Sequence, residues 1–194
     1  MTKKNGVTLC RTGQSLCLVF LCATMGGFIF SGCSKEKSVE TRGPSGAGAC
    51  EVFDKLPGDV GKSVEVNYGN KVKLLGISTN KLSPNKLKVS YYWQPQEDLG
   101  EYKQVFVHFT DAENKGLFQN DHLFCQKPFG EIKGKIVKET YTVDVPQSAA
   151  GKEIEVKVGV YSPVAQSNAR LKAESAGTSV DDLNTRASVE KIKF

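Results

Sequence analysis

Apolar and polar residues alternate in many short stretches beyond residue 70, and this period of two predicts β-strands. Between Leu87 and Trp93, Leu, Val, Tyr and Trp occupy one face, while Lys, Ser and Tyr occupy the other. Between Val105 and Thr110 both faces are partly apolar, as expected of a central strand. Further strands are predicted to begin at Val72, to cover residues 140–145 and 153–160, to close the chain at 192–194 and, more weakly, to cover residues 117–124.

Residues that favour turns separate the predicted strands. Gly, Pro, Asn or Asp stand at 56–59, 83–85, 112–116 and 149–152. No stretch shows the pattern of an amphipathic helix of three turns. Because many short strands joined by turns are typical of an all-β fold, we predict an antiparallel, immunoglobulin-like β-sandwich of about seven to nine strands over residues 49–194.

A different pattern occupies residues 1–32. Lys3, Lys4 and Arg11 precede a stretch from Leu16 to Phe30 that is almost entirely apolar or small. A positive start, an apolar segment and small residues before a cleavage point are the parts of a secretory signal peptide. We therefore expect residues 1–32 to direct export and to be removed from the mature protein.

The segment Phe30-Ser31-Gly32-Cys33 resembles the lipobox of bacterial lipoproteins. The resemblance implies that the Cys33 thiol is acylated, that cleavage occurs before Cys33, and that acyl chains such as palmitate hold the protein on a membrane. Phe30 departs from the Leu that the family most often has. Two or three acyl chains make stable anchoring plausible, because one chain binds only marginally. An uncleaved anchor helix over residues 12–32 and cleavage without a lipid are the alternatives.

Residues 33–48 predict a flexible tether between the lipidated Cys33 and the sandwich. They are rich in Gly, Ser and charged side chains, and Val39 is their one sizeable apolar residue. In the lipoprotein family the residue after the lipidated Cys influences sorting, and Ser34 resembles the type found at the outer membrane. We expect a lipoprotein of the cell envelope, in the periplasm or at the surface, on the outer membrane in preference to the inner one.

Removing residues 1–32 changes the charge and the cysteine content. The whole chain has 26 Lys and Arg against 21 Asp and Glu, and the removed segment takes away three basic residues and no acids. The small remaining excess and the export signal argue against nucleic acid as a partner. Of the cysteines that follow residue 32, Cys33 would carry the lipid, which leaves Cys50 and Cys125. An oxidising periplasm permits a disulfide between these two. Two separate buried thiols are the alternative.

An ordered set of short motifs extends over about residues 70–194. The set resembles a β-sandwich module of bacterial envelope proteins, which also occurs at the end of multi-spanning, glycosyltransferase-like membrane proteins. Phe129 stands where that family usually has a Trp. The resemblance implies a sandwich fold and an envelope setting rather than a reaction. The motifs are Val105–Asp111, Phe118–His122, Gly134–Val137, Tyr141–Pro146, Val158–Tyr161 and Arg170-Leu171.

Aromatic side chains suggest a surface for sugar rings. Tyr91 and Trp93 share the apolar row of their strand, so we expect both in the core. Tyr92 falls on the other face near Lys88 and is a candidate ligand contact, and Tyr161 is a similar case.

The same part of the chain is basic. Residues 66–96 contain no acid but five Lys, at 71, 73, 81, 86 and 88. Such a face suits anionic lipid headgroups or acidic polysaccharide, or it protects the sheet edges from unwanted pairing.

Four ionisable residues could approach one another if a hairpin forms around Gly116. His108, Asp111, Asp121 and His122 could then bind Zn or Cu or support acid–base chemistry. In the structural alternative, Asp121 caps loop backbone and His108 fills a half-buried strand position.

No nucleophile elbow and no HExxH motif occurs in the sequence. We therefore expect a non-catalytic binding or assembly module without a cofactor. Glycan binding is the first alternative, and a metal-binding or enzymatic site around His108 and His122 is the second.

Overall fold

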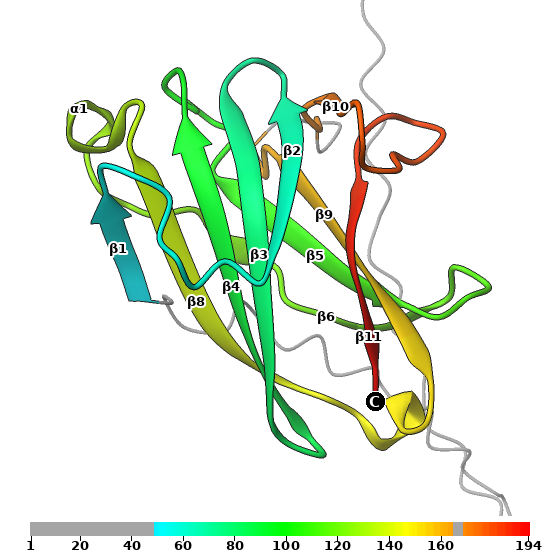
Figure 1. Cartoon of the computed structure of the whole chain (residues 1–194). Helices are drawn as coiled ribbons and strands as arrows, with labels where there is room; N and C mark the ends of the chain where they lie inside the picture. The colour runs from blue at the N-terminus through cyan, green and yellow to red at the C-terminus, as the bar shows by residue number, and fades with distance from the viewer. Residues whose placement is uncertain (1–48, 165–168) are drawn as a thin grey trace, which may run out of the picture. The chain divides into compact units, whose positions relative to one another are not determined.

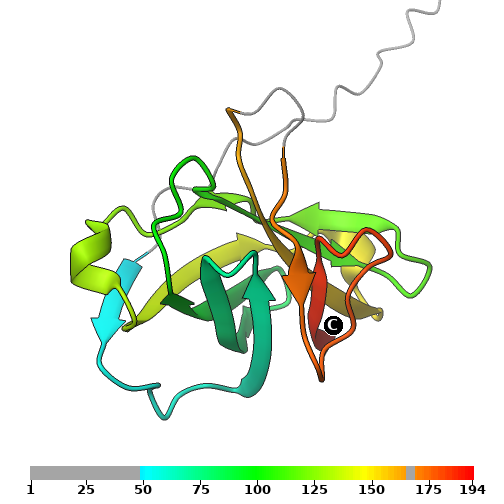
Figure 2. The same cartoon turned by 90° about the horizontal axis from the view of Figure 1, so that it is seen from above.

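The computed structural model describes residues 49–164 and 169–194, which form two antiparallel sheets packed face to face (Figures 1 and 2). The six-stranded sheet has the order β1-β8-β4-β3-β2-β10, and the five-stranded sheet has the order β11-β9-β5-β6 with β7 also paired to β5. The predicted all-β sandwich is confirmed. The strands are β1 (Ala49–Phe53), β2 (Lys62–Tyr68), β3 (Val72–Ser83), β4 (Lys86–Pro95), β5 (Gln104–Thr110), β6 (Gly116–Gln119), β7 (His122–Leu123), β8 (Ile136–Asp144), β9 (Glu153–Tyr161), β10 (Ala173–Glu174) and β11 (Ala187–Lys193).

The predicted signal peptide, the predicted lipidation site at Cys33 and the predicted tether all lie outside the described residues. Within the described part, helical structure is limited to the single turn α1 (Phe129–Ile132) and the 3-10 turn η1 (Gln147–Ala149). No helix in this part is long and apolar enough to cross a membrane.

The strand count of the described residues is eleven, which exceeds the seven to nine predicted. The excess comes from short pieces, since β7 and β10 have two residues each. The weak strand predicted over 117–124 divides into β6 and β7, because the backbone leaves the sheet at Asn120 and Asp121. The sequence reading missed β1 and β2 as well as β10.

The apolar rows of the two sheets face each other and form the core. Leu87, Val89, Tyr91 and Trp93 on β4 are fully buried, as are Val105, Val107 and Phe109 on β5. Burial of such rows stabilises the fold by roughly 25 cal/mol per Å² of apolar area. The hydroxyl of Tyr68 on β2 donates to the Val158 carbonyl on β9 at 2.9 Å, so a hydrogen bond also crosses the interface between the sheets.

Cys50 and Cys125 form a disulfide, with their Cα atoms 5.8 Å apart. Cys50 lies on β1 at the edge of the six-stranded sheet, whereas Cys125 follows β7, which pairs with β5 of the other sheet. The bond therefore links the two sheets at one edge and closes a loop of 75 residues.

Removing this disulfide should destabilise the sandwich strongly. The entropy of closing so long a loop corresponds to about 4 kcal/mol. We expect the Cys50→Ala/Cys125→Ala variant to unfold at clearly lower urea concentration than the parent chain, and reductant to shift the parent in the same direction. Urea melts followed by the fluorescence of Trp93 measure this difference. Coincident melts of the parent with and without reductant would contradict the disulfide.

Candidate functional site

A hollow of about 190 Å³ lies on the outer face of the five-stranded sheet. Its lining consists of Phe106 and His108 from β5, Tyr161 from the end of β9, Asp121 from the connection between β6 and β7, and Arg170. These residues lie far apart in the sequence, so the topology of the sheet brings them together.

Alternation along β5 places Phe106 and His108 on the outside. Their neighbours Val105, Val107 and Phe109 point into the core, and successive side chains of a strand face opposite sides. Antiparallel pairing then aligns Tyr161 with Gln104, and a bridge between Tyr161 and Arg170 brings the arginine to the same place.

Gly159 provides the room that Phe106 occupies. The two residues are partners across the β5–β9 ladder, and a Cβ atom at Gly159 would overlap with the Phe106 ring and with the Thr185 carbonyl. Only glycine allows an aromatic ring to lie this close to the neighbouring strand. Gly159 thus fixes Phe106 as the apolar floor of the hollow, where it is 3% exposed.

Aromatic and cationic groups stack around this floor. The guanidinium carbon of Arg170 lies 4.8 Å from the centre of the Phe106 ring, a cation–π contact. The Tyr161 ring stands edge-on to Phe106, with centroids 5.9 Å apart, and the His108 ring lies 5.3 Å away. Arg170 itself is exposed, so its N–H groups are accessible to a ligand.

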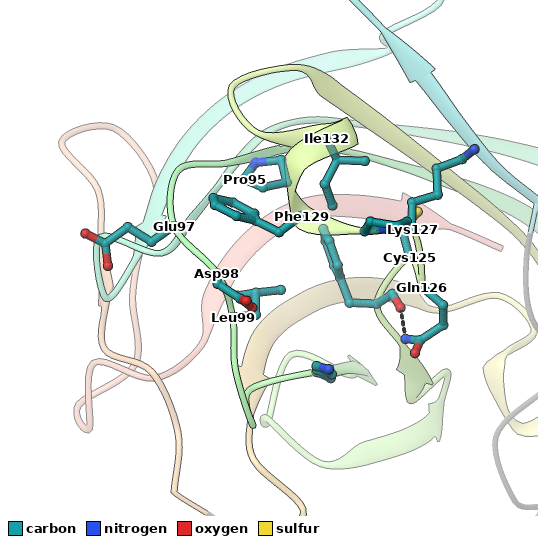
Figure 3. Close-up of a pocket in the computed structure, with 12 residues that line it drawn as sticks. Pro95, Glu97, Asp98, Leu99, Cys125, Gln126, Lys127, Phe129 and Ile132 are labelled. Atoms are coloured by element: carbon teal, nitrogen blue, oxygen red, sulfur yellow. Dashed lines mark hydrogen bonds between the residues drawn. The ribbon is translucent and has the colours of Figure 1, made fainter.

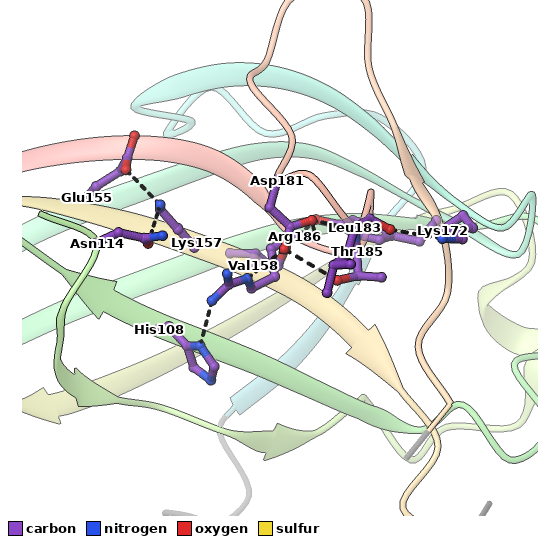
Figure 4. Close-up of polar contacts among 11 residues, drawn as sticks. His108, Asn114, Glu155, Lys157, Val158, Lys172, Asp181, Leu183, Thr185 and Arg186 are labelled. Carbon is purple, nitrogen blue, oxygen red and sulfur yellow. Dashed lines mark hydrogen bonds and ion pairs between the residues drawn. The ribbon is translucent and has the colours of Figure 1, made fainter. Parts of the chain in front are cut away.

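His108 is held by an arginine that is itself held by an aspartate (Figure 4). Nη1 of Arg186 lies 3.4 Å from Nδ1 of His108, and Nε of Arg186 donates to Oδ2 of Asp181 at 2.9 Å. Because an arginine only donates, Nδ1 of His108 accepts and Nε2 carries the proton. Burial lowers the pKa of His108, with Arg186 and Arg170 acting in the same direction and Asp121 against them. His108 is therefore neutral at pH 7, with a donor at Nε2.

Asp121 contributes an acceptor. Its Oδ1 accepts a hydrogen bond from the Val107 N–H at 3.1 Å, which fixes the carboxylate against β5. Burial raises the pKa of Asp121, while the Val107 N–H and the two nearby histidines lower it. The hollow thus combines a carboxylate, an imidazole N–H, a guanidinium and the half-buried Tyr161 ring, a set that suits a ligand with several hydroxyl groups.

Tyr92 and Lys88, which were predicted to bind a ligand, lie outside this hollow. Tyr92 is 0% exposed, so the prediction that it offers a face to a ligand is wrong. The segment between β1 and β2 crosses over the outer face of the six-stranded sheet (Figure 1), where the Tyr92 hydroxyl donates to the Asp59 carbonyl at 3.1 Å. Lys88 is exposed on the same sheet, away from the hollow. Tyr161 does line the hollow and is half-buried.

The four residues considered for a metal are not brought together. His122 pairs with Val105 and therefore faces the core, whereas His108 on β5 faces outward. Asp111 is buried at the end of β5, where its carboxylate accepts from the Lys115 N–H at 2.9 Å. Among residues 49–164 and 169–194, no three His, Cys, Asp or Glu side chains are placed to hold a metal ion. The second alternative, a site built around both histidines, would need them on one face, whereas the pairing of β7 places them on opposite faces of the sheet.

His122 instead forms a buried polar pair with Glu139. Nε2 of His122 lies 3.6 Å from Oε2 of Glu139, and both side chains are 1% exposed. The imidazole Nδ1 is hydrogen bonded to the Asn120 carbonyl at 2.9 Å, and the ring stacks on Tyr91 with centroids 5.5 Å apart. The pair lies beside the disulfide, since Glu139 is the ladder partner of Cys50. No sequence pattern pointed to it.

A second hollow of about 240 Å³ lies beside the disulfide, between α1 and the connection that follows β4 (Figure 3). Its walls combine apolar residues, among them Pro95, Leu99 and Phe129, with charged residues such as Glu97 and Lys127. It could accept an apolar side chain, but its polar groups do not converge on a common point as those around His108 do. Sequence reasoning missed this hollow, because its walls come from separate connections.

No known protein family, curated protein or solved structure matches this chain. The function proposed below is therefore drawn from the sequence motifs and from the geometry of the hollow on the five-stranded sheet.

Removing one member of the buried pair should destabilise the fold far more than removing an exposed carboxylate. We expect Glu139→Ala to cost about 3 kcal/mol, because it leaves His122 buried without its partner. The double variant His122→Leu/Glu139→Leu should recover part of that loss. Urea unfolding of both variants, with the exposed Glu51→Ala as control, measures these differences. If Glu139→Ala costs no more than Glu51→Ala, the pair has no structural role.

Proposed function

We propose that this chain is a non-catalytic, lipid-anchored lipoprotein of the bacterial cell envelope whose sandwich works as a binding module. The sequence supports the anchor through the signal-like residues 1–32, the lipobox that ends at Cys33 and the polar segment 33–48. The two-sheet sandwich supports the module, since it is a compact body that presents a lined hollow on one sheet.

The ligand that we propose for this hollow is a glycan. The observation that carries the proposal is the convergence of Tyr161, Arg170, His108 and Asp121 over the Phe106 ring. A sugar presents apolar C–H faces and pairs of hydroxyl groups. The half-buried Tyr161 ring can pack against those faces, while a carboxylate and a guanidinium form strong, charge-assisted hydrogen bonds with the hydroxyls.

A binding role fits this hollow better than catalysis. Its described lining holds no Ser, Cys or Lys side chain that could serve as a nucleophile. Asp121 is restrained by the Val107 N–H and His108 by Arg186, so both are held as fixed hydrogen-bonding groups.

Glycan binding should depend on the hollow and not on the opposite sheet. Screening the full chain on an array of envelope glycans should give a signal that Tyr161→Ala and Arg170→Ala each weaken by about tenfold or more, the equivalent of about 1.4 kcal/mol. Lys88→Ala is the control, because Lys88 is exposed on the other sheet. Equal loss in all three variants, or no signal with the parent chain, would count against glycan binding at this site.

Anchoring has a separate test. Cys33→Ser should release the protein from membranes and abolish labelling by a fatty-acid analogue, because the thiol is the proposed acylation site. Fractionation of cells that express the parent chain and the variant measures the release. If the variant stays in the membrane fraction, residues 12–32 act as an uncleaved anchor instead.

A further inference from the structure

In the hairpin of β3 and β4, β3 extends beyond its neighbour β2. The ladder between β2 and β3 ends where Lys62 pairs with Ile77, yet β3 continues to Ser83. The tip therefore protrudes at one end of the sandwich (Figure 1). We use the name hairpin tip for residues 80–86; Leu82 within it is 54% exposed.

The hairpin tip combines this exposed leucine with positive charge. Lys81, Lys86 and Lys88 are all exposed, and residues 66–96 contain no acid. Lys86 forms an ion pair with Asp144 on the neighbouring β8, while the Lys81 ammonium contacts the Lys193 carbonyl and lies 4.9 Å from the centre of the Phe194 ring. An apolar side chain flanked by lysines is the pattern that binds the interface of an anionic bilayer.

The chain enters β1 opposite the middle of β8, on the side of β1 that faces the hairpin tip. Ala49 pairs with Thr140 and Phe53 pairs with Ile136, so β1 begins toward the Asp144 end of β8. Asp144 in turn pairs with Lys86 of the hairpin. Cys33 precedes Ala49 by sixteen residues, which span at most roughly 55 Å even when fully extended. A lipid on Cys33 would therefore keep the start of β1 within this distance of a bilayer.

We propose that the hairpin tip rests on an anionic lipid surface beside the anchor, with Leu82 among the headgroups and Lys81, Lys86 and Lys88 facing lipid phosphates. This inference rests on the proposed lipid anchor. Lysines near such a surface are attracted to its negative charge, and the anchor has already brought the surface within reach.

This orientation places the proposed glycan-binding hollow, on the outer face of the five-stranded sheet, away from the membrane. Glu153 at the start of β9 pairs with Lys193, whose carbonyl contacts Lys81, so β9 begins at the hairpin end. Tyr161 lies eight residues farther along β9, which is roughly 26 Å at the rise of a strand. The domain would then stand with one end on the lipid and the hollow at the other.

Tryptophan fluorescence tests this orientation in the full, lipidated chain. The native Trp93 is the single tryptophan and is 0% exposed, so it gives a constant background. We would introduce Leu82→Trp or, as the matched control near the opposite end, Leu183→Trp, where the native leucine is 65% exposed. Both variants would be reconstituted in vesicles of phosphatidylglycerol and phosphatidylcholine with brominated acyl chains.

Quenching of the L82W emission should exceed that of the L183W emission by about twofold or more, because only the hairpin tip reaches the lipid. Adding Lys88→Glu to the L82W variant should reduce the quenching, whereas Lys103→Glu, an exposed lysine at the start of β5, should leave it unchanged. Equal quenching at both positions overturns the proposal. A response of the L82W emission to soluble acidic polysaccharide but not to vesicles also overturns it and assigns the tip to that polymer.

Labelling of the same preparations with a fatty-acid analogue separates this inference from the proposed function. A chain that carries the label but shows equal quenching retains its anchor and lacks the orientation. A chain that takes up no label contradicts the anchor itself.

Discussion

The pairing of β5 with β9 is the constraint on which both the core and the hollow depend. In this register, Val107 aligns with Val158 and both side chains are fully buried. The same register places Phe106 opposite Gly159 on the outer face, where glycine leaves room for the ring. A slip of one residue would turn every side chain of β5 to the other face. The core residues therefore fix the position of the proposed binding residues.

The edge of the sandwich near β1 is stabilised by covalent and polar groups. The Cys50–Cys125 disulfide links the sheets there, and the buried pair of His122 and Glu139 lies next to it. Burying two polar side chains costs desolvation energy, and such pairs often contribute more to a unique arrangement than to stability. At this edge it fixes β7, and thereby the connection that carries Asp121 to the outer hollow.

The alternation of apolar residues was enough to predict the sandwich and most of its long strands, because burial of one face is a local signal. Tyr161 could be chosen for the same reason, as it continues the outward row of β9. The prediction failed at Tyr92, because a non-local segment around Asp59 covers it. Arg170 was named only as part of a family motif, since its contact with Phe106 depends on a bridge between distant parts of the chain.

The central claim is that the outer face of β5 and β9 is the binding surface. Nuclear magnetic resonance of the full chain in detergent, titrated with the glycan that gives the strongest array signal, tests it most directly. We expect the resonances of Phe106, His108, Tyr161 and Arg170 to shift together and to saturate at one dissociation constant. Shifts confined to the hollow around Phe129, with the β5 resonances unchanged, would contradict the claim.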